Sequence, residues 1–178
     1  MKNIFWIVVL IVVVAIGGAL LFIYWDNIRA AGVDTFTECR DRGFPVSESF
    51  PAVCSAPGGK TFTEDIGNLL EKENLIRIET PRPNEIIKSP MVVEGEARGF
   101  WFFEASFPVR VKDANGKELG VGIAQAQGEW MTEEFVPFNT VMEFAEPETE
   151  TGTLILEKDN PSGLPENADE MHFPVRFR

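Results

Sequence analysis

The chain has 178 residues, a formal net charge of −12 at pH 7 and an isoelectric point near 4.6. So acidic a chain is repelled by nucleic acid and by anionic lipid headgroups, which argues against both as ligands, and we predict no nucleic-acid partner. Its length suits about one domain with an appendage.

The first element is an uncharged apolar run over Ile4–Trp25. A helix over this run would be about 33 Å long, which is enough to cross a hydrocarbon core of about 30 Å. Trp6 near one end, and Tyr24 with Trp25 at the other, suit the aromatic belts of a membrane interface. We therefore predict a transmembrane signal-anchor over residues 1–26 that binds the membrane through residues 4–25.

A cleaved secretory signal peptide is the alternative interpretation of this run. Signal peptides have apolar regions of about 7–15 residues and end at an A-x-A-like cleavage site. Here the run is longer, and Ala30 and Ala31 follow Arg29. Lys2 precedes the run and Asp26 follows it, which favours a cytoplasmic amino terminus. We predict a single-pass plasma-membrane protein whose carboxy-terminal domain is extracytoplasmic.

Residues 27–64 are predicted to be a spacer and a Cys-bracketed mini-hairpin. Cys39 and Cys54 are the two cysteines, and an even number outside the cytoplasm favours a disulfide, worth about 3 kcal/mol in the chain-entropy model. Two free buried thiols are the alternative. The tetrapeptide Thr-Phe-Thr-Glu occurs at Thr35–Glu38 and again at Thr61–Glu64. Its alternation is typical of a strand, so we predict that the two copies pair.

Residues 65–74 are predicted to form a short helical linker. Asp65 is a candidate N-cap, and Ile66, Leu69 and Leu70 share one helical face.

Residues 75–178 consist of short alternating runs separated by turn signals. The expected strands are Ile76–Ile78, Met91–Val93, Phe107–Val111, Glu118–Ala126, Glu133–Phe138, Val141–Phe144, Thr153–Glu157 and His172–Phe177. Asn115-Gly116 is the strongest hairpin signal. Pro108 and Pro174 lie inside expected strands, which should therefore be edge or bulged strands. The pattern predicts an all-β fold, a β-sandwich of about seven strands.

The order of several motifs in this part of the chain resembles a known family. The motifs are Ile76–Glu85, Ser89-Pro90 before Val93-Glu94-Gly95-Glu96-Ala97, Phe103-Glu104-Ala105, Asp113–Gly116, and Trp130 near Phe135. Over Leu75–Arg178 they resemble the immunoglobulin-like domain of bacterial spore germination. The resemblance implies an immunoglobulin-like sandwich that binds or assembles and is not an enzyme. It supplies no ligand and does not imply a role in sporulation. The Cys-bracketed segment resembles short modules that precede such domains in envelope proteins.

Gly99–Phe103 is the densest aromatic cluster outside the predicted anchor. Side chains alternate between the two faces of a strand, so they cannot all point inward. We predict that at least one of Phe100, Trp101 and Phe102 lies off the core and that these three residues contact an envelope protein or a cell-wall glycan. A plug over the open end of the sandwich is the alternative.

Other chemistry is weakly indicated. The single histidine, His172, is expected to be exposed on a strand, and we predict no catalytic residues, no cofactor and no metal site. The loop Asp159–Glu170 is rich in the oxygen ligands that calcium prefers, but Pro161 and Pro165 favour an ordinary surface turn.

Together these features predict a membrane-anchored, extracytoplasmic, noncatalytic binding or assembly module of the bacterial cell envelope. A secreted peptidoglycan- or carbohydrate-binding module and an envelope hydrolase are the alternatives.

Overall fold

The computed structural model describes the backbone of residues 2–178, and the side chains of residues 6, 10–21, 24, 25, 28 and 31–178. Its internal contacts divide the chain into two compact units, Met1–Glu64 and Asp65–Arg178. Each unit has a hydrophobic cluster of its own.

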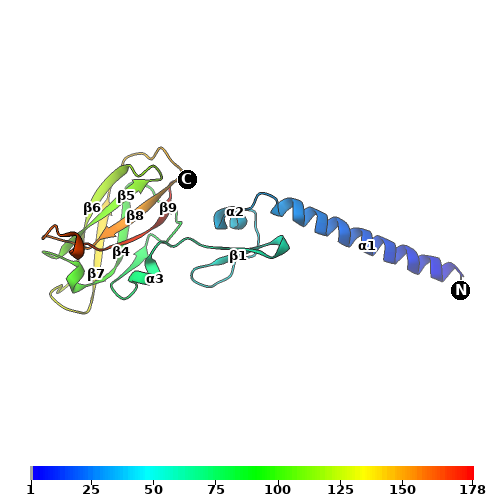
Figure 1. Ribbon diagram of the computed structural model, residues 1–178, viewed down its shortest axis with the longest axis horizontal. Coiled ribbons are helices and arrows are strands. Elements are labelled where there is room, and N and C mark those ends of the chain that lie inside the picture. Colours follow the sequence, from blue (N-terminus) through cyan, green and yellow to red (C-terminus); the bar gives the residue numbers. More distant parts are fainter. Residues whose placement is uncertain (1) are drawn as a thin grey trace. The chain divides into compact units, whose positions relative to one another are not determined.

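The first unit begins with a long helix, α1 (Lys2–Ala30) (Figure 1). Among the described residues, no helical segment has the combination of length and apolar composition that a membrane crossing requires. Several residues that carry the predicted span and its orientation have side chains outside the described ones, namely residues 2, 4, 5, 7–9, 22, 23, 26, 29 and 30.

The rest of the first unit is a short helix and a small hairpin. The elements are α2 (Phe36–Asp41), β1 (Val53–Ala56), the 3₁₀ turn η1 (Pro57–Gly59) and β2 (Lys60–Thr63). β1 and β2 pair antiparallel, with Cys54 opposite Phe62. Gly58 and Gly59 both have positive φ, which glycine adopts without the steric penalty of a side chain.

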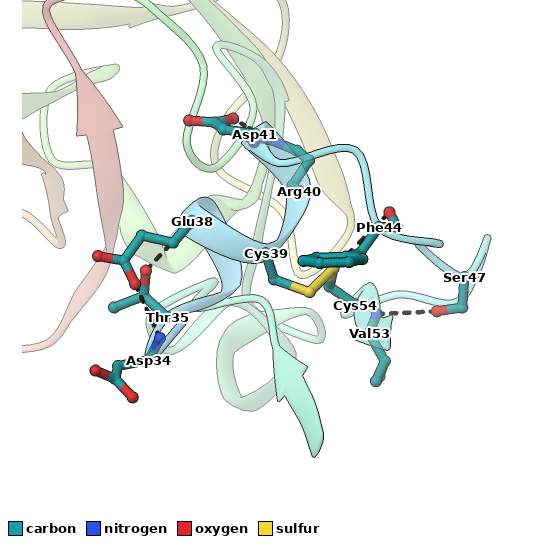
Figure 2. Close-up of a disulfide and its surroundings, with 10 residues drawn as sticks. All are labelled: Asp34, Thr35, Glu38, Cys39, Arg40, Asp41, Phe44, Ser47, Val53 and Cys54. Atoms are coloured by element: carbon teal, nitrogen blue, oxygen red, sulfur yellow. Dashed lines mark hydrogen bonds and ion pairs between the residues drawn. A yellow bond between two sulfur atoms is a disulfide. The ribbon is translucent and has the colours of Figure 1, made fainter. Parts of the chain in front are cut away.

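The predicted pairing of the two Thr-Phe-Thr-Glu copies is wrong. The second copy runs through β2, but the first caps and begins α2. The Thr35 hydroxyl accepts a hydrogen bond from the Glu38 N–H at 3.2 Å, and the Glu38 carboxylate accepts one from the Asp34 N–H at 2.9 Å (Figure 2). These reciprocal bonds form a variant of the capping box, a helix-start signal that outweighs strand alternation here. The Asp34 N–H, foremost, lowers the pKa of Glu38.

The predicted disulfide is confirmed. Cys39 on α2 is bonded to Cys54 on β1, with 6.1 Å between their Cα atoms. The ring of Phe44 lies beside the bridge (Figure 2). The buried residues around it are few: Val33, Phe36, Cys39, Cys54 and Ala56. A core of this size gives little hydrophobic stabilisation, so the bridge is needed to hold the unit together.

The second unit contains one short helix, seven strands and two 3₁₀ turns (Figure 1). In chain order they are α3 (Leu69–Lys72), β3 (Ile76–Thr80), β4 (Met91–Arg98), η2 (Gly99–Trp101), β5 (Ser106–Asp113), β6 (Glu118–Ala126), β7 (Phe135–Met142), β8 (Thr151–Glu157), η3 (Pro165–Asn167) and β9 (Glu170–Arg176). The strands form one antiparallel sheet in the order β3-β4-β7-β6-β5-β8-β9. The prediction of an all-β unit with about seven strands is confirmed.

The sheet folds over into two facing layers. β6 and β7 share only the residue pairs Gln125↔Asn139 and Ala126↔Phe138, whereas their other neighbours pair along most of their length. Phe107 on β5 meets Phe138 on β7 edge to face, with 4.9 Å between the ring centroids. Apolar residues from both layers fill the space between them in a single cluster, which gives the sandwich its core.

One local expectation about the strands needs correction. The separate strands predicted at Glu133–Phe138 and Val141–Phe144 are one strand, β7. Pro174 lies on an edge strand, β9, as expected, and Pro108 lies on β5, which has neighbours on both sides and a shift of register between Val111 and Lys112. Pro108 is tolerated because β8 begins to pair with β5 only at Val109, so the missing N–H of the proline has no strand beside it there.

The predicted helical linker is also shorter than expected. The helix begins at Leu69, and the Asp65 carboxylate accepts a hydrogen bond from the Gly67 N–H, which forms a turn before the helix. Ile66 and Leu69 are buried, whereas Leu70, predicted to share their helical face, is exposed. Gly67 has a positive φ, and a Cβ there would collide with the backbone of β9, so the chain can approach β9 only at a glycine.

Two segments, one at Asn68 and the other at residues 84–87, cover the outer edge of β9. Asn68 donates its backbone N–H to the His172 carbonyl and accepts from the His172 N–H through its side chain. Asn84 donates to the Pro174 carbonyl, and Ile87 donates to that of Arg176. The backbone groups of this edge are thus satisfied, which protects it from pairing with another chain.

Candidate binding site at one end of the sandwich

Three loops converge at one end of the sandwich. They are residues 99–105 around η2, the β6–β7 loop (127–134) and the β8–β9 loop (158–169). The Gly99 N–H donates to the Glu134 carbonyl at 3.2 Å, and the Asp159 N–H donates to the Trp101 carbonyl at 3.0 Å. A Cβ at residue 99 would collide with carbonyl oxygens of the β6–β7 loop, so only glycine allows this approach.

Arg98, at the end of β4, fixes the base of the β6–β7 loop. Its guanidinium donates to the Asn74 and Glu133 carbonyls, each at 3.1 Å. The same group stacks over the Phe135 ring, 4.0 Å from the centroid, and Arg77 stacks on that ring at the same distance. Stacking and hydrogen bonding together hold the loop in one position before any ligand arrives.

The predicted aromatic site is divided between core and surface. Trp101 is 0% exposed and Phe102 is 4% exposed, whereas Phe100 is 51% and Phe103 is 42% exposed. Of the three predicted contact residues, only Phe100 is therefore exposed, and Trp101 and Phe102 belong to the core. The 3₁₀ turn η2 replaces strand alternation here and turns Trp101 into the core while Phe100 faces out. The prediction that at least one of the three lies off the core is confirmed by Phe100.

Phe103 owes its position to a strained turn. Phe103 and Ser106 exchange backbone hydrogen bonds of 3.0 and 3.1 Å, and the two residues between them, Glu104 and Ala105, have φ of 52° and 62°. A non-glycine residue in this left-handed region costs about 1–2 kcal/mol. Such strain persists only where the surrounding structure imposes it, and it is concentrated at ligand-binding sites. The turn thus marks Phe103 as a candidate contact residue.

Phe100 lies between two shallow hollows. One, of about 330 Å³, is lined by Phe100, Trp130 and Met131 among others. The other, of about 270 Å³, is lined by Phe100, Phe103 and residues 158–162 among others. Met131 is 74% exposed. Phe100, Phe103 and Met131 thus form one exposed apolar surface, here called the aromatic end patch, and exposed aromatic residues beside hollows are typical of binding sites.

The β8–β9 loop binds its own polar groups. The Ser162 hydroxyl donates to the Asn160 side-chain oxygen at 2.5 Å, and the Asn167 amide donates to Ser162 at 3.0 Å. Oxygens that the sequence offers to calcium are thus used within the loop. Among the described residues, no group of three or more His, Cys, Asp or Glu side chains is arranged to hold a metal ion.

His172 and a further hollow are the remaining candidate features of the unit, and this hollow shares residues 158–160 with the smaller hollow beside Phe100. His172 is half-buried on β9, and its Nδ1 lies 3.2 Å from a Glu170 carboxylate oxygen. A polar hollow of about 590 Å³ lies between α3 and the β8–β9 loop. The ion pair of Lys72 with Asp169 involves two of the residues that line it. Neither feature includes a residue of the aromatic end patch.

Sequence reasoning missed Met131 and Phe103. Met131 is far from residues 99–103 in the chain, and only the close approach at Gly99 brings the two loops together. The signal that could have identified Phe103 is the pair Glu104-Ala105 directly after an aromatic run, in the place where a two-residue hairpin turn would need positive φ.

The family model for the immunoglobulin-like domain of bacterial spore germination matches residues 75–163. The chain belongs to this family. The resemblance read from the motifs is thereby confirmed. The comparison with curated proteins returned no match, and neither did the comparison with solved structures. The matched residues end before β9, yet β9 pairs with β8 from Glu157 to Thr151. The folded unit of this family member therefore includes residues beyond the match.

Proposed function

We propose that this protein is a noncatalytic binding or assembly module of the bacterial cell envelope and that the aromatic end patch contacts its partner. One observation carries the proposal: Phe100 and Phe103 are exposed on loops that hydrogen bonds and a glycine contact hold in place. A rigid apolar surface loses little entropy on binding, which favours affinity.

We also propose that α1 anchors the chain in the plasma membrane, with the sandwich and the disulfide-bonded residues 31–64, here called the stapled unit, outside the cytoplasm. The apolar run over Ile4–Trp25 and a disulfide in the adjoining unit support this topology. The Arg42 guanidinium donates to the Ala31 and Gly32 carbonyls at 2.7 and 3.0 Å, just after α1. This contact would hold the stapled unit at the end of the anchor.

Fractionation of producing cells tests the topology. We expect the chain to stay in membranes after alkaline carbonate washing and to be digested from the outer side in spheroplasts. Mass spectrometry of the purified protein should find Lys2 and the rest of α1 retained. A mature chain that begins after residue 29, recovered in the soluble extracytoplasmic fraction, would contradict anchoring and favour the secreted alternative.

Site-specific photocrosslinking in those cells tests the contact surface. A photoreactive benzoylphenylalanine replaces Phe100 or Phe103 in the test variants, and Val121 or Val141 in the controls, which are exposed strand residues of the same unit. We expect discrete adducts from positions 100 and 103 that positions 121 and 141 do not give. Equal adduct yields at all four positions, or none at position 100, would contradict the assignment.

A further inference from the structure

We propose that the aromatic end patch takes a cationic polypeptide segment, one in which apolar side chains are flanked by lysine or arginine. This inference rests on the proposed function and names the chemistry of the partner at that site. The inference rests on three features of the three loops. These are their negative charge, the size of the hollows, and the hydrogen bonds that their polar side chains make to one another.

The rim of the patch is strongly acidic. Residues 99–105, 127–134 and 158–168 contain Glu104, Glu129, Glu133, Glu134, Asp159 and Glu166 against one basic residue, Lys158. Glu134 lies 3.9 Å from the Arg98 guanidinium. Within the part of the chain that the structure describes, no cation pairs with Glu104 or Glu133. Their field attracts positive charge and repels anionic lipid, which argues against a membrane surface as the ligand.

The hollows fit side chains better than sugars. At about 330 and 270 Å³, they lie at the small end of ligand pockets, which span about 300–1,000 Å³. Each is open and has Phe100 on its wall, so one large apolar side chain can enter on either side of that ring. An extended segment with two apolar residues would straddle Phe100 and place its flanking charges over the rim.

The polar side chains at the site are poorly placed for a glycan. Sugar recognition needs free donors and acceptors for hydroxyl groups, because an unpaired buried polar group is costly. Asn160, Ser162 and Asn167 line the smaller hollow but bond to one another. The second Asn160 bond, to the Leu164 carbonyl at 2.8 Å, also stays within the loop. Apart from Lys158, what the site presents freely is apolar surface and carboxylate, which matches a basic, apolar peptide.

The test uses the full-length chain in neutral detergent and four fluorescent probes. The first is a peptide with two central leucines flanked on each side by two lysines. The second replaces the lysines with glutamates, the third replaces the leucines with serines, and the fourth is a soluble muropeptide. Fluorescence anisotropy should show the first probe binding at least about tenfold more tightly than each of the others, a difference of about 1.4 kcal/mol. Its affinity should fall as salt is raised.

A charge swap provides the decisive variant. Glu104→Lys with Glu133→Lys should weaken the lysine peptide about tenfold and strengthen the glutamate peptide. Both side chains are exposed, so the fold should be kept, and the thermal midpoint checks this. The matched control, Glu94→Lys with Glu143→Lys, changes the net charge equally at exposed residues outside the three loops. If both double variants lose affinity for the lysine peptide equally, net charge alone attracts the peptide and the inference is overturned.

The outcomes separate this inference from the proposed function. If positions 100 and 103 crosslink in cells but the muropeptide binds best, the patch is a binding site and the inference of a cationic peptide is wrong. If the lysine and glutamate peptides bind equally, the inference is also wrong. If crosslinking at those positions fails, the proposed function fails regardless of the peptide result.

Discussion

Residues 31–64 and residues 65–178 maintain their folds by different means. The smaller region has a core of a few side chains around the Cys39–Cys54 disulfide, whereas the sandwich has a large core and no cysteine. Below about 40 residues, a chain buries too little apolar surface to fold without a bridge, a metal or a partner. The covalent bond of the smaller region therefore replaces core volume.

The two regions also differ in their turns. In residues 31–64, the described residues with positive φ are all glycines: Gly32, Gly43, Gly58 and Gly59. The sandwich places Asn84, Glu104 and Ala105 in that region of backbone space. A large core can hold strained residues in place, and a small one has no such reserve. Two of these three residues, Glu104 and Ala105, lie in the candidate site of the better-packed unit.

The largest effect is expected from Trp101→Ala. This change removes a fully buried indole from the sandwich core and should lower the free energy of unfolding of residues 65–178 by about 3–5 kcal/mol. Phe100→Ala, one residue earlier and exposed, should cost about 0.5 kcal/mol or less. Urea unfolding followed by tryptophan fluorescence or circular dichroism measures both. Similar losses from the two changes would mean that η2 does not divide the cluster as described.

Removal of the disulfide should have the next largest effect, and only on the smaller region. The bridge closes a loop with a sequence separation of 15, for which the chain-entropy model gives about 3 kcal/mol. We expect Cys39→Ser with Cys54→Ser to abolish protection from hydrogen exchange in α2 and β1 and to leave β4–β9 protected. Protection that survives in α2 would show that its core is sufficient without the bridge.

The repeated tetrapeptide gives a matched pair of variants. Thr35→Ala removes the N-cap of α2 and should destabilise the smaller region by about 1 kcal/mol. Thr61→Ala makes the same change in an exposed strand residue of β2 and should cost about 0.5 kcal/mol or less. The urea midpoint of the smaller region, read by hydrogen exchange in α2, compares them. Equal costs would remove the capping explanation for the different structures of the two copies.

Relief of strain should stabilise the sandwich slightly. Ala105 has φ of 62°, which glycine adopts freely, so Ala105→Gly should raise the free energy of unfolding by about 0.5–1 kcal/mol after the greater unfolded-state entropy of glycine is subtracted. Ala114→Gly, outside the positive-φ positions, is the control and should not stabilise. A loss of stability in Ala105→Gly would mean that the turn is unstrained.

The smallest effect is expected from lowering the pH, which should destabilise the smaller region. The pKa of Glu38 is lowered from its ordinary value of 4.5, chiefly by the Asp34 N–H, so the carboxylate stabilises the folded smaller region above that value. The contribution is lost as the pH falls through the lower pKa of the folded state. Protection of α2 in the wild type should fall as the pH is lowered below about 4.5, and Glu38→Gln should lose less protection over the same interval. Identical pH profiles would contradict the cap.

The sequence predicted those features that follow from local patterns. Alternation identified the strands, Asn115-Gly116 identified the β5–β6 turn, where Gly116 has φ of 80°, and the cysteine pair identified the disulfide. It failed where two local signals conflicted. The tetrapeptide at Thr35–Glu38 suits both a strand and a capping box. The hydrogen bonds that the Asp34 and Glu38 N–H groups donate to the Glu38 and Thr35 side chains favour the helix.

The candidate site was predictable only in part. Alternation correctly required an outward aromatic residue, but it could not show that a 3₁₀ turn would bury Trp101 and expose Phe100. Met131 joins the patch through a contact between distant loops, at a glycine that no local pattern singles out. Long-range approach of this kind is set by the packing of the whole sandwich, which the pattern of any single segment does not contain.

Hydroxyl-radical footprinting tests most directly whether the aromatic end patch is a contact surface. Met131 and Phe100 are exposed in the isolated chain, as is Phe50 in the smaller region, and methionine is readily oxidised. Oxidation at these three residues is compared between intact envelopes and the purified full-length protein. We expect Met131 and Phe100 to be protected in the envelope and Phe50 to be oxidised equally in both samples. Equal oxidation of Met131 and Phe100 in the two samples would contradict that expectation.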